Sequence, residues 1–157
     1  RGGYHLPPGS SLLQDRLYLN TGGGRFRPTE GALPEILTST SAVRAADYDG
    51  DGDLDLFVGG RLTPGDYPTP PRSYLLRNDG GRFTDVTAEV APQLLDPGGM
   101  ITDAAWIDFD GDGAVDLVTA GTWMPIGHPF CHGAWTGSHT ELRNIPKTGR
   151  AGIRRRR

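Results

Sequence analysis

Two nine-residue segments of the chain share the pattern D-x-D-G-D-G-x-x-D, and this duplication restricts the fold more than any other feature. The segments span residues 47–55 and 108–116, and together they hold nine of the 15 aspartates in the 157-residue chain. Carboxylates packed this densely in one turn repel each other strongly unless a counter-ion is present. A hard divalent cation relieves that repulsion, and oxygen ligands on a flexible loop suit Ca²⁺ better than Mg²⁺. We therefore predict that each segment binds Ca²⁺.

The start of each segment also matches an EF-hand loop, which is an alternative interpretation. An EF-hand needs a bidentate glutamate at position 12 and a helix on each side. Position 12 is Val58 in the first segment and Thr119 in the second, and the flanking sequences are typical of strands. We therefore expect the ninth aspartate to close a loop between two strands of one sheet. A second alternative, two solvated acidic turns without an ion, does not account for the duplicated spacing.

A second duplicated pattern, L-x-x-N-x-G followed closely by R-F, predicts β-hairpins with glycine-rich turns. It occurs around residues 16–29 and 73–87, with Phe26 and Phe83 57 residues apart, while Asp47 and Asp108 are 61 residues apart. Two hairpins in each period give four antiparallel strands, which is the size of a β-propeller blade. The predicted fold is all-β: a β-propeller fragment of about two four-stranded antiparallel blades with D-x-D-G-D-G-x-x-D calcium loops.

The blade interpretation makes further structural predictions. The largely apolar runs at residues 54–58 and 115–118 should be strands buried near the centre of a stack. The proline-rich residues 61–72 should form an excursion outside the sheet. Because a closed propeller needs at least about four blades, a chain of two blades should expose apolar residues at its open ends. The residues expected there include Leu56, Phe57 and Val118.

Composition excludes several other classes of protein. With 24 glycines and 13 prolines, the chain is not expected to be an all-helical bundle. It contains no run of 18 apolar residues, so no transmembrane helix is predicted. The single cysteine, Cys131, cannot form an internal disulfide. The sequence contains no nucleophile elbow, Walker loop or dinucleotide fingerprint, so we predict that it is not an enzyme. Trp106 is predicted to be a packing residue, whereas Trp123, at a strand end, could pack or form part of a ligand platform, and we favour packing.

Residues 127–157 depart from the repeat and contain six arginines and one lysine against a single glutamate. We interpret them as an atypical basic tail, either disordered or frame-shifted, and not as a nucleic-acid-binding patch, because Arg154–Arg157 lack interleaved aromatic residues. Four residues of the tail have the side-chain types of a zinc site, but their spacing matches no standard zinc pattern. They are His128, Cys131, His132 and His139.

The acidic loops and the L-x-x-N-x-G hairpins together resemble FG-GAP/VCBS repeats, the calcium-bearing blades of integrin-α-type propellers and of many bacterial surface proteins. The resemblance covers about residues 12–126, and we assign residues 1–126 to propeller blades. Residues 59–73 and 121–126 further resemble bacterial FG-GAP proteins that often include an ASPIC/UnbV module, although no such module is visible in this sequence. The resemblance implies a Ca²⁺ ligand set in each loop: Asp47, Asp49, Asp51, Asp53 (carbonyl) and Asp55, and Asp108, Asp110, Asp112, Ala114 (carbonyl) and Asp116.

The same resemblance implies a non-catalytic, secreted or cell-surface protein used for adhesion or for binding a ligand or glycan. A signal peptide is expected outside this chain. The implied partners are the remaining propeller blades of the parent protein and an extracellular protein or glycan, with no nucleic acid. The alternative is that the repeats form a substrate-binding scaffold within a larger carbohydrate-active or lipid-cleaving enzyme.

Overall fold

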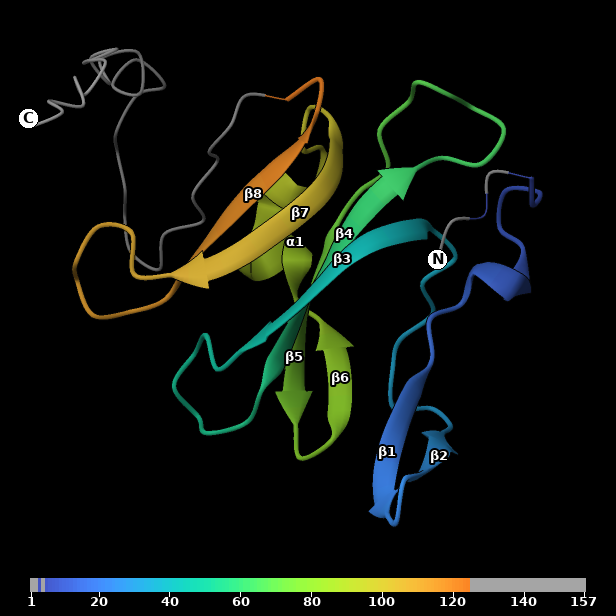
Figure 1. Ribbon diagram of the computed structural model, residues 1–157. Coiled ribbons are helices and arrows are strands. Elements are labelled where there is room, and N and C mark those ends of the chain that lie inside the picture. The colour runs from blue at the N-terminus through green and yellow to red at the C-terminus, as the bar shows by residue number, and fades with distance from the viewer. Residues whose placement is uncertain (1–2, 4, 125–157) are drawn as a thin grey trace, which may run out of the picture.

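Eight β-strands make up nearly all the regular secondary structure in residues 3 and 5–124, which this computed structural model describes (Figure 1). Helical structure there is limited to the four-residue α1 (Thr87–Val90) and two short 3₁₀ turns. The all-β prediction is therefore confirmed. The strands are β1 (Leu17–Gly22), β2 (Arg25–Thr29), β3 (Ser39–Ala46), β4 (Asp55–Leu62), β5 (Tyr74–Asp79), β6 (Arg82–Asp85), β7 (Met100–Ile107) and β8 (Asp116–Thr122).

The strands form three antiparallel sheets with two, four and two members. The central sheet has the order β3-β4-β5-β6, while β1-β2 and β7-β8 are separate hairpins. A four-stranded antiparallel meander is the unit expected for one propeller blade. The described residues therefore contain one complete blade and two half-blades, in agreement with the predicted strand content. Residues 63–73 connect β4 to β5 outside the sheet, so the excursion predicted for residues 61–72 is present but starts two residues later, because Arg61 and Leu62 belong to β4.

The central sheet is buried on both faces, which explains why its middle strands are almost continuously apolar. Side chains alternate between the two faces of a strand. Phe57 and Leu75 face one core, together with Ile101 and Leu117 of the β7-β8 hairpin. The intervening side chains contribute to a second core on the opposite face, whose buried members are Ile36, Val58, Tyr74, Leu76 and Phe83.

Strand β7 lies beside β3 and β4, so the inner hairpin of the next half-blade packs against the complete blade (Figure 1). Ser41 Oγ donates a hydrogen bond to the carbonyl oxygen of Ile101 (2.6 Å), and Arg44 Nε donates to that of Ala104 (2.7 Å). The guanidinium of Arg44 also pairs with Asp103. These polar contacts hold the two sheets together along the strands that do not share a backbone ladder.

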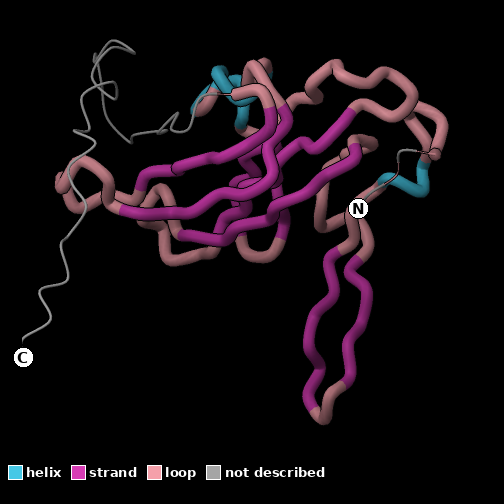
Figure 2. Tube along the Cα trace, turned by 45° about the horizontal axis from the view of Figure 1, so that its top comes forward, coloured by secondary structure: helices cyan, strands magenta, loops and turns pink. Residues whose placement is uncertain are grey.

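Apolar residues are exposed, as predicted, but they are not the residues that were predicted. Phe57 is fully buried because the β7-β8 side of the sheet covers it. Leu56 and Val118 are half-buried. Exposed apolar side chains are instead spread over several of the described elements. Three of them, Tyr18, Leu19 and Phe26, lie together on the β1-β2 hairpin, which projects away from the other strands (Figure 2).

The two tryptophans expected to pack have different environments. The ring of Trp106 stacks on that of Tyr48, with centroids 6.4 Å apart, and its Nε1 donates a hydrogen bond to the carbonyl oxygen of Arg44. Trp106 is thus a packing residue, as predicted. Trp123 is 61% exposed and contacts the similarly exposed ring of Tyr67, with centroids 5.4 Å apart. The expectation of packing is therefore wrong for Trp123 as far as the core is concerned.

The equivalent phenylalanines of the two hairpins should differ greatly in their contribution to stability. Phe83 is 9% exposed in the second core, whereas Phe26 is 64% exposed. We expect Phe83→Ala to lower the free energy of unfolding by about 3–5 kcal/mol. Phe26→Ala should lower it by about 0.5 kcal/mol or less. Denaturant unfolding of the two variants measures the difference, and equal losses would show that the β1-β2 hairpin packs as the β5-β6 hairpin does.

Candidate metal centre

The two acidic loops occupy equivalent positions in their hairpins. Residues 47–54 connect β3 to β4, and residues 108–115 connect β7 to β8 (Figure 1). In each loop the ninth aspartate is the first residue of the returning strand. Because β5 runs antiparallel to β4, the β5-β6 turn lies at the same end of the blade as residues 47–54.

The glycines at positions 4 and 6 give both loops the same backbone path. Gly50 and Gly52 have φ values of 77° and 95°, and Gly111 and Gly113 have values of 79° and 91°. Residues with side chains rarely adopt these positive φ angles. The glycines thus allow each loop to turn tightly enough to bring its aspartates together.

The first aspartate of each loop fixes the turn through its side chain. Both carboxylate oxygens of Asp47 accept backbone hydrogen bonds, from Gly50 N–H (2.8 Å) and Gly52 N–H (3.1 Å). Asp108 accepts the corresponding bonds from Gly111 (2.7 Å) and Gly113 (3.2 Å). The two loops therefore have the same local geometry, as their shared sequence predicts.

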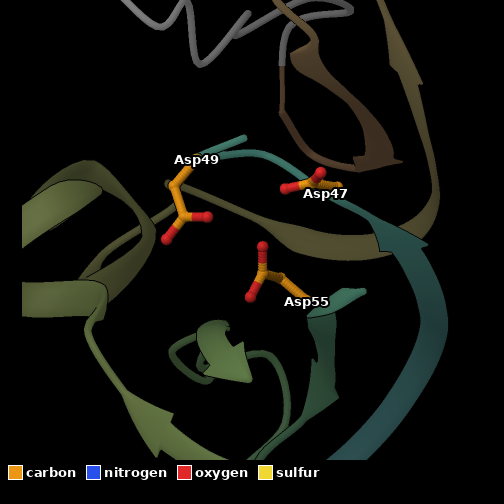
Figure 3. A group of neighbouring side chains, drawn as sticks. All are labelled: Asp47, Asp49 and Asp55. Carbon is orange, nitrogen blue, oxygen red and sulfur yellow. The ribbon is translucent and has the colours of Figure 1, made fainter. Parts of the chain in front are cut away.

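Three aspartates of each loop converge. One carboxylate oxygen from each of Asp47, Asp49 and Asp55 lies within 4.8 Å of the others, and Figure 3 shows the three side chains around a common space. The same arrangement occurs in the second loop. Its members are Asp108, Asp110 and Asp116.

The predicted ligands at positions 5 and 7 are not members of these triads. The Oδ1 atoms of Asp51 and Asp112 accept hydrogen bonds from the backbone N–H groups of Asp53 and Ala114, each at 2.8 Å. The side chain of Asp53 turns away to the β5-β6 hairpin, where its Oδ2 accepts a hydrogen bond from Gly80 N–H (2.9 Å). The predicted carbonyl role of Asp53 and Ala114 stays a prediction.

Asp55 is the most deeply buried member of the first triad. Its carboxylate is fully buried and accepts hydrogen bonds from the backbone N–H groups of Asn78 (2.8 Å) and Tyr48 (3.2 Å). Burial raises the pKa of Asp55 above its ordinary value, with a smaller contribution from the negative charges of Asp49 and Asp51. Burial, followed by the charges of Asp49 and Asp55, raises the pKa of the Tyr48 hydroxyl to about 12.

The chemistry of this donor set fits a hard divalent cation. Each triad offers three carboxylates, and the groups that donate hydrogen bonds to Asp55 are neutral backbone amides. Neutral donors do not cancel the charge of the converging carboxylates, whereas a bound cation would. Oxygen-only ligands favour Ca²⁺ or Mg²⁺ over the softer transition metals.

The structure also bears on the alternative interpretations. Strands flank both loops, and Val58, which occupies position 12 of the first loop, is buried in the second core. The first loop therefore lacks both features of an EF-hand. The basic tail and the histidines and cysteine of the zinc hypothesis lie outside the described residues.

Asn78 is a residue of the site to which the sequence analysis assigned no role. Its side-chain Nδ2 donates a hydrogen bond to the carbonyl oxygen of Leu54 (3.0 Å), inside the first acidic loop. The available signal was the asparagine that recurs in both L-x-x-N-x-G hairpins, at Asn20 and Asn78.

A four-stranded meander with an acidic loop in its inner hairpin defines a propeller-type repeat protein. The family model for the FG-GAP-like repeat matches residues 9–58 and 65–119, and the chain belongs to this family. The match concerns the repeats alone, so the association with an ASPIC/UnbV module stays a prediction. Neither a curated protein nor a solved structure matches the chain. Among the described residues, no helix has the length and apolar character needed to cross a membrane.

The raised pKa of Asp55 predicts an unusual pH dependence for the metal-free protein. A raised folded-state pKa means that the folded chain holds the proton more tightly than the unfolded chain does. The resulting stabilisation is present at low pH and is lost as the pH rises through the folded pKa. With Ca²⁺ bound, this residue should show the opposite trend, because ion binding requires ionised carboxylates.

Denaturant unfolding between about pH 4 and pH 7 tests this prediction in metal-depleted and Ca²⁺-saturated samples. Asp55→Asn is the control because it removes the titrating group. The contribution of Asp55 is the difference in unfolding free energy between wild type and this variant. If that contribution became more favourable with rising pH in the metal-free samples, the expected pKa direction would be wrong.

Proposed function

We propose that this propeller-type repeat domain binds Ca²⁺ at both acidic loops and serves as a non-catalytic, secreted or cell-surface module for adhesion or for binding a ligand or glycan. The observation that carries the proposal is the pair of aspartate triads with the same local geometry. Their positions in two FG-GAP-like repeats support the same conclusion. Membership of the family is consistent with Ca²⁺ but leaves the ion itself to experiment.

The triad residues of each loop would hold the ion, with the fifth-position aspartate and the seventh-position carbonyl completing the set. Ca²⁺ would supply the positive charge that offsets the clustered carboxylates. The residues of the chain preorganise the site, because Asp47 and Asp108 fix the two turns through backbone hydrogen bonds. A preorganised loop loses less conformational entropy on binding an ion.

The position of the aspartates favours a structural role over a catalytic one. The members of each triad lie together within one tight turn, and four of the six carboxylates are half-exposed or exposed. General acid–base catalysis on a glycoside requires two carboxylates on opposite sides of a substrate bond. The exposed apolar residues of β1-β2 support a further partner, namely other propeller blades that would cover Tyr18, Leu19 and Phe26.

An exposed aromatic pair supports ligand or glycan binding at the opposite end of the blade. Tyr67 lies in the loop after β4 and Trp123 follows β8, so both lie at the end of their hairpins remote from the acidic loops. The side chains are 55% and 61% exposed, and the rings are in contact. Exposed aromatic side chains are enriched at binding surfaces because they present a large, rigid apolar face.

Calorimetric titration should detect about two Ca²⁺ sites in the full chain. Asp49→Ala removes a member of the first triad and should eliminate one site, and Asp110→Ala should eliminate the other. The matched control is Asp66→Ala, which removes an exposed aspartate outside both loops and should leave both sites intact. A folded wild-type sample that binds neither Ca²⁺ nor Mg²⁺ would refute the proposed ion binding.

The ligand-binding proposal predicts a second, separable loss of function. On a panel of immobilised oligosaccharides, wild type should bind at least one glycan, and Trp123→Ala and Tyr67→Ala should each weaken that binding about tenfold or more. Ca²⁺ titration of these variants should remain unchanged, because both residues are remote from the acidic loops. Tyr18→Ala is the control, since it removes an exposed ring elsewhere. Glycan binding that is unaffected by either aromatic substitution would exclude the pair as the binding surface.

A further inference from the structure

The β5-β6 hairpin is joined to the first acidic loop by side-chain hydrogen bonds instead of a strand ladder. Strand β5 pairs with β4 at only three positions, Tyr74 to Leu76 opposite Leu56 to Val58. Beyond Leu76, the hairpin continues past the end of this ladder. The remaining connection between the hairpin turn and the inner half of the blade is therefore made by the acidic loop itself.

Three hydrogen bonds make this connection. The backbone N–H of Asn78 donates to Asp55 Oδ1 (2.8 Å), Asn78 Nδ2 donates to the carbonyl oxygen of Leu54 (3.0 Å), and Gly80 N–H donates to Asp53 Oδ2 (2.9 Å). The Asn78 carboxamide also fixes its own turn, because its Oδ1 accepts a hydrogen bond from Gly81 N–H (2.7 Å). One asparagine thus links the hairpin turn to the loop.

The loop and the hairpin belong to different sequence repeats. The first family match ends at residue 58 and includes the loop, whereas the second begins at residue 65 and includes the β5-β6 hairpin. Asp55 is shared between the two, because its Oδ2 closes its own loop on Tyr48 while its Oδ1 holds Asn78 of the following repeat. A change in the position of Asp55 would therefore move a contact of the next repeat.

We propose that the ion in loop 47–55 controls how firmly the β5-β6 hairpin of the following repeat is docked, with Asn78 and Asp53 as positioning residues between the two. This inference rests on the proposed function, because it requires Ca²⁺ to bind the loop. Without an ion, the carboxylates of Asp49, Asp51 and Asp55 repel one another, which loosens the loop that holds the hairpin. With an ion, the loop is fixed, and Asp55 and the Leu54 carbonyl oxygen are held where Asn78 binds them.

The chain contains natural controls for this coupling. Asn20 occupies the equivalent position in the β1-β2 hairpin, but among the described residues its carboxamide binds only Gly22 N–H, within its own turn (2.9 Å). In the second acidic loop, Ala114 stands where Asp53 stands in the first and has no side-chain acceptor. Asn20→Ala is thus a matched control for Asn78→Ala. Asp53→Ala gives the first loop the same residue at position 7 as the second loop.

Amide hydrogen exchange of the full chain, with and without Ca²⁺, measures the docking of the hairpin directly. If undocking requires release of the ion, the amides of residues 78–81 should exchange about 100-fold more slowly at a Ca²⁺ concentration 100 times the dissociation constant. The turn amides of residues 20–23 should be unchanged. Asp53→Ala and Asn78→Ala should each reduce the Ca²⁺-dependent protection of residues 79–81.

Ca²⁺ affinity provides the reciprocal measurement, because coupling between two sites acts in both directions. Asn78→Ala should weaken Ca²⁺ binding at the first loop about tenfold while leaving the second loop unchanged. The NMR amide signals of Gly52 and Gly113 report the two loops separately. Asn20→Ala should affect neither loop. If Asn78→Ala does not fold, Asp53→Ala tests the same coupling through hydrogen exchange, because it removes the hydrogen bond to Gly80, together with one negative charge, and leaves Asn78 in place.

The possible outcomes separate this inference from the proposed function. Failure of wild type to bind Ca²⁺ at either loop overturns the proposed function and the coupling with it. Binding of Ca²⁺ at both loops, with unchanged exchange at residues 78–81, overturns the coupling alone. Equal effects of Asn78→Ala and Asn20→Ala on first-loop affinity would also overturn it, because the carboxamide hydrogen bond of Asn20 stays within its own turn.

Discussion

The arrangement of the blade depends on buried aspartates at the start of two strands. Asp55 and Asp116 are 0% and 1% exposed, and burial of a carboxylate is costly unless other groups compensate for it. Each accepts a hydrogen bond from the backbone N–H of the second residue of its own loop, Tyr48 or Phe109. These bonds pull the beginning of the loop onto the beginning of the returning strand. The closed loop in turn sets the pairing of β3 with β4 and of β7 with β8.

The sequence repeat and the structural blade are out of phase by half a unit. Each family match begins before an outer hairpin and ends just after an acidic loop, whereas the complete blade starts at β3 and ends at β6. The blade therefore combines the second half of one repeat with the first half of the next. Nearest-neighbour contacts of this kind are what stabilise repeat proteins, since a single repeat cannot bury its own apolar face. The bonds from Asp53 and Asp55 to the β5-β6 hairpin are part of this contact between repeats.

The sequence predicted local structure well because local structure is encoded by short patterns. The positions of glycine and aspartate determine the path of the acidic loops, and alternating apolar residues determine both faces of β4 and β5. The burial of individual side chains could not be predicted from such short patterns. Phe26 and Phe83 occupy equivalent positions in their motifs, yet only Phe83 has an inner strand pair beside its hairpin in the described part of the chain. Phe57, expected at an open face, is instead covered by β7-β8, because that hairpin packs on the blade.

The same limit explains why the roles of Asn78 and the Asp53 side chain were not predicted. Their partners are 23 to 27 residues away in sequence, so no local pattern indicates the contact. Asn20 and Asn78 have the same sequence context, and only the presence of an acidic loop opposite Asn78 distinguishes them. Position 7 of the two acidic loops differs in the same way. The Asp53 side chain accepts a hydrogen bond from the neighbouring hairpin turn, whereas Ala114 has no side-chain acceptor. Residues at equivalent positions of the repeat thus have different roles because the neighbouring half-blade gives them different partners. Two loops with the same local geometry can therefore differ in function.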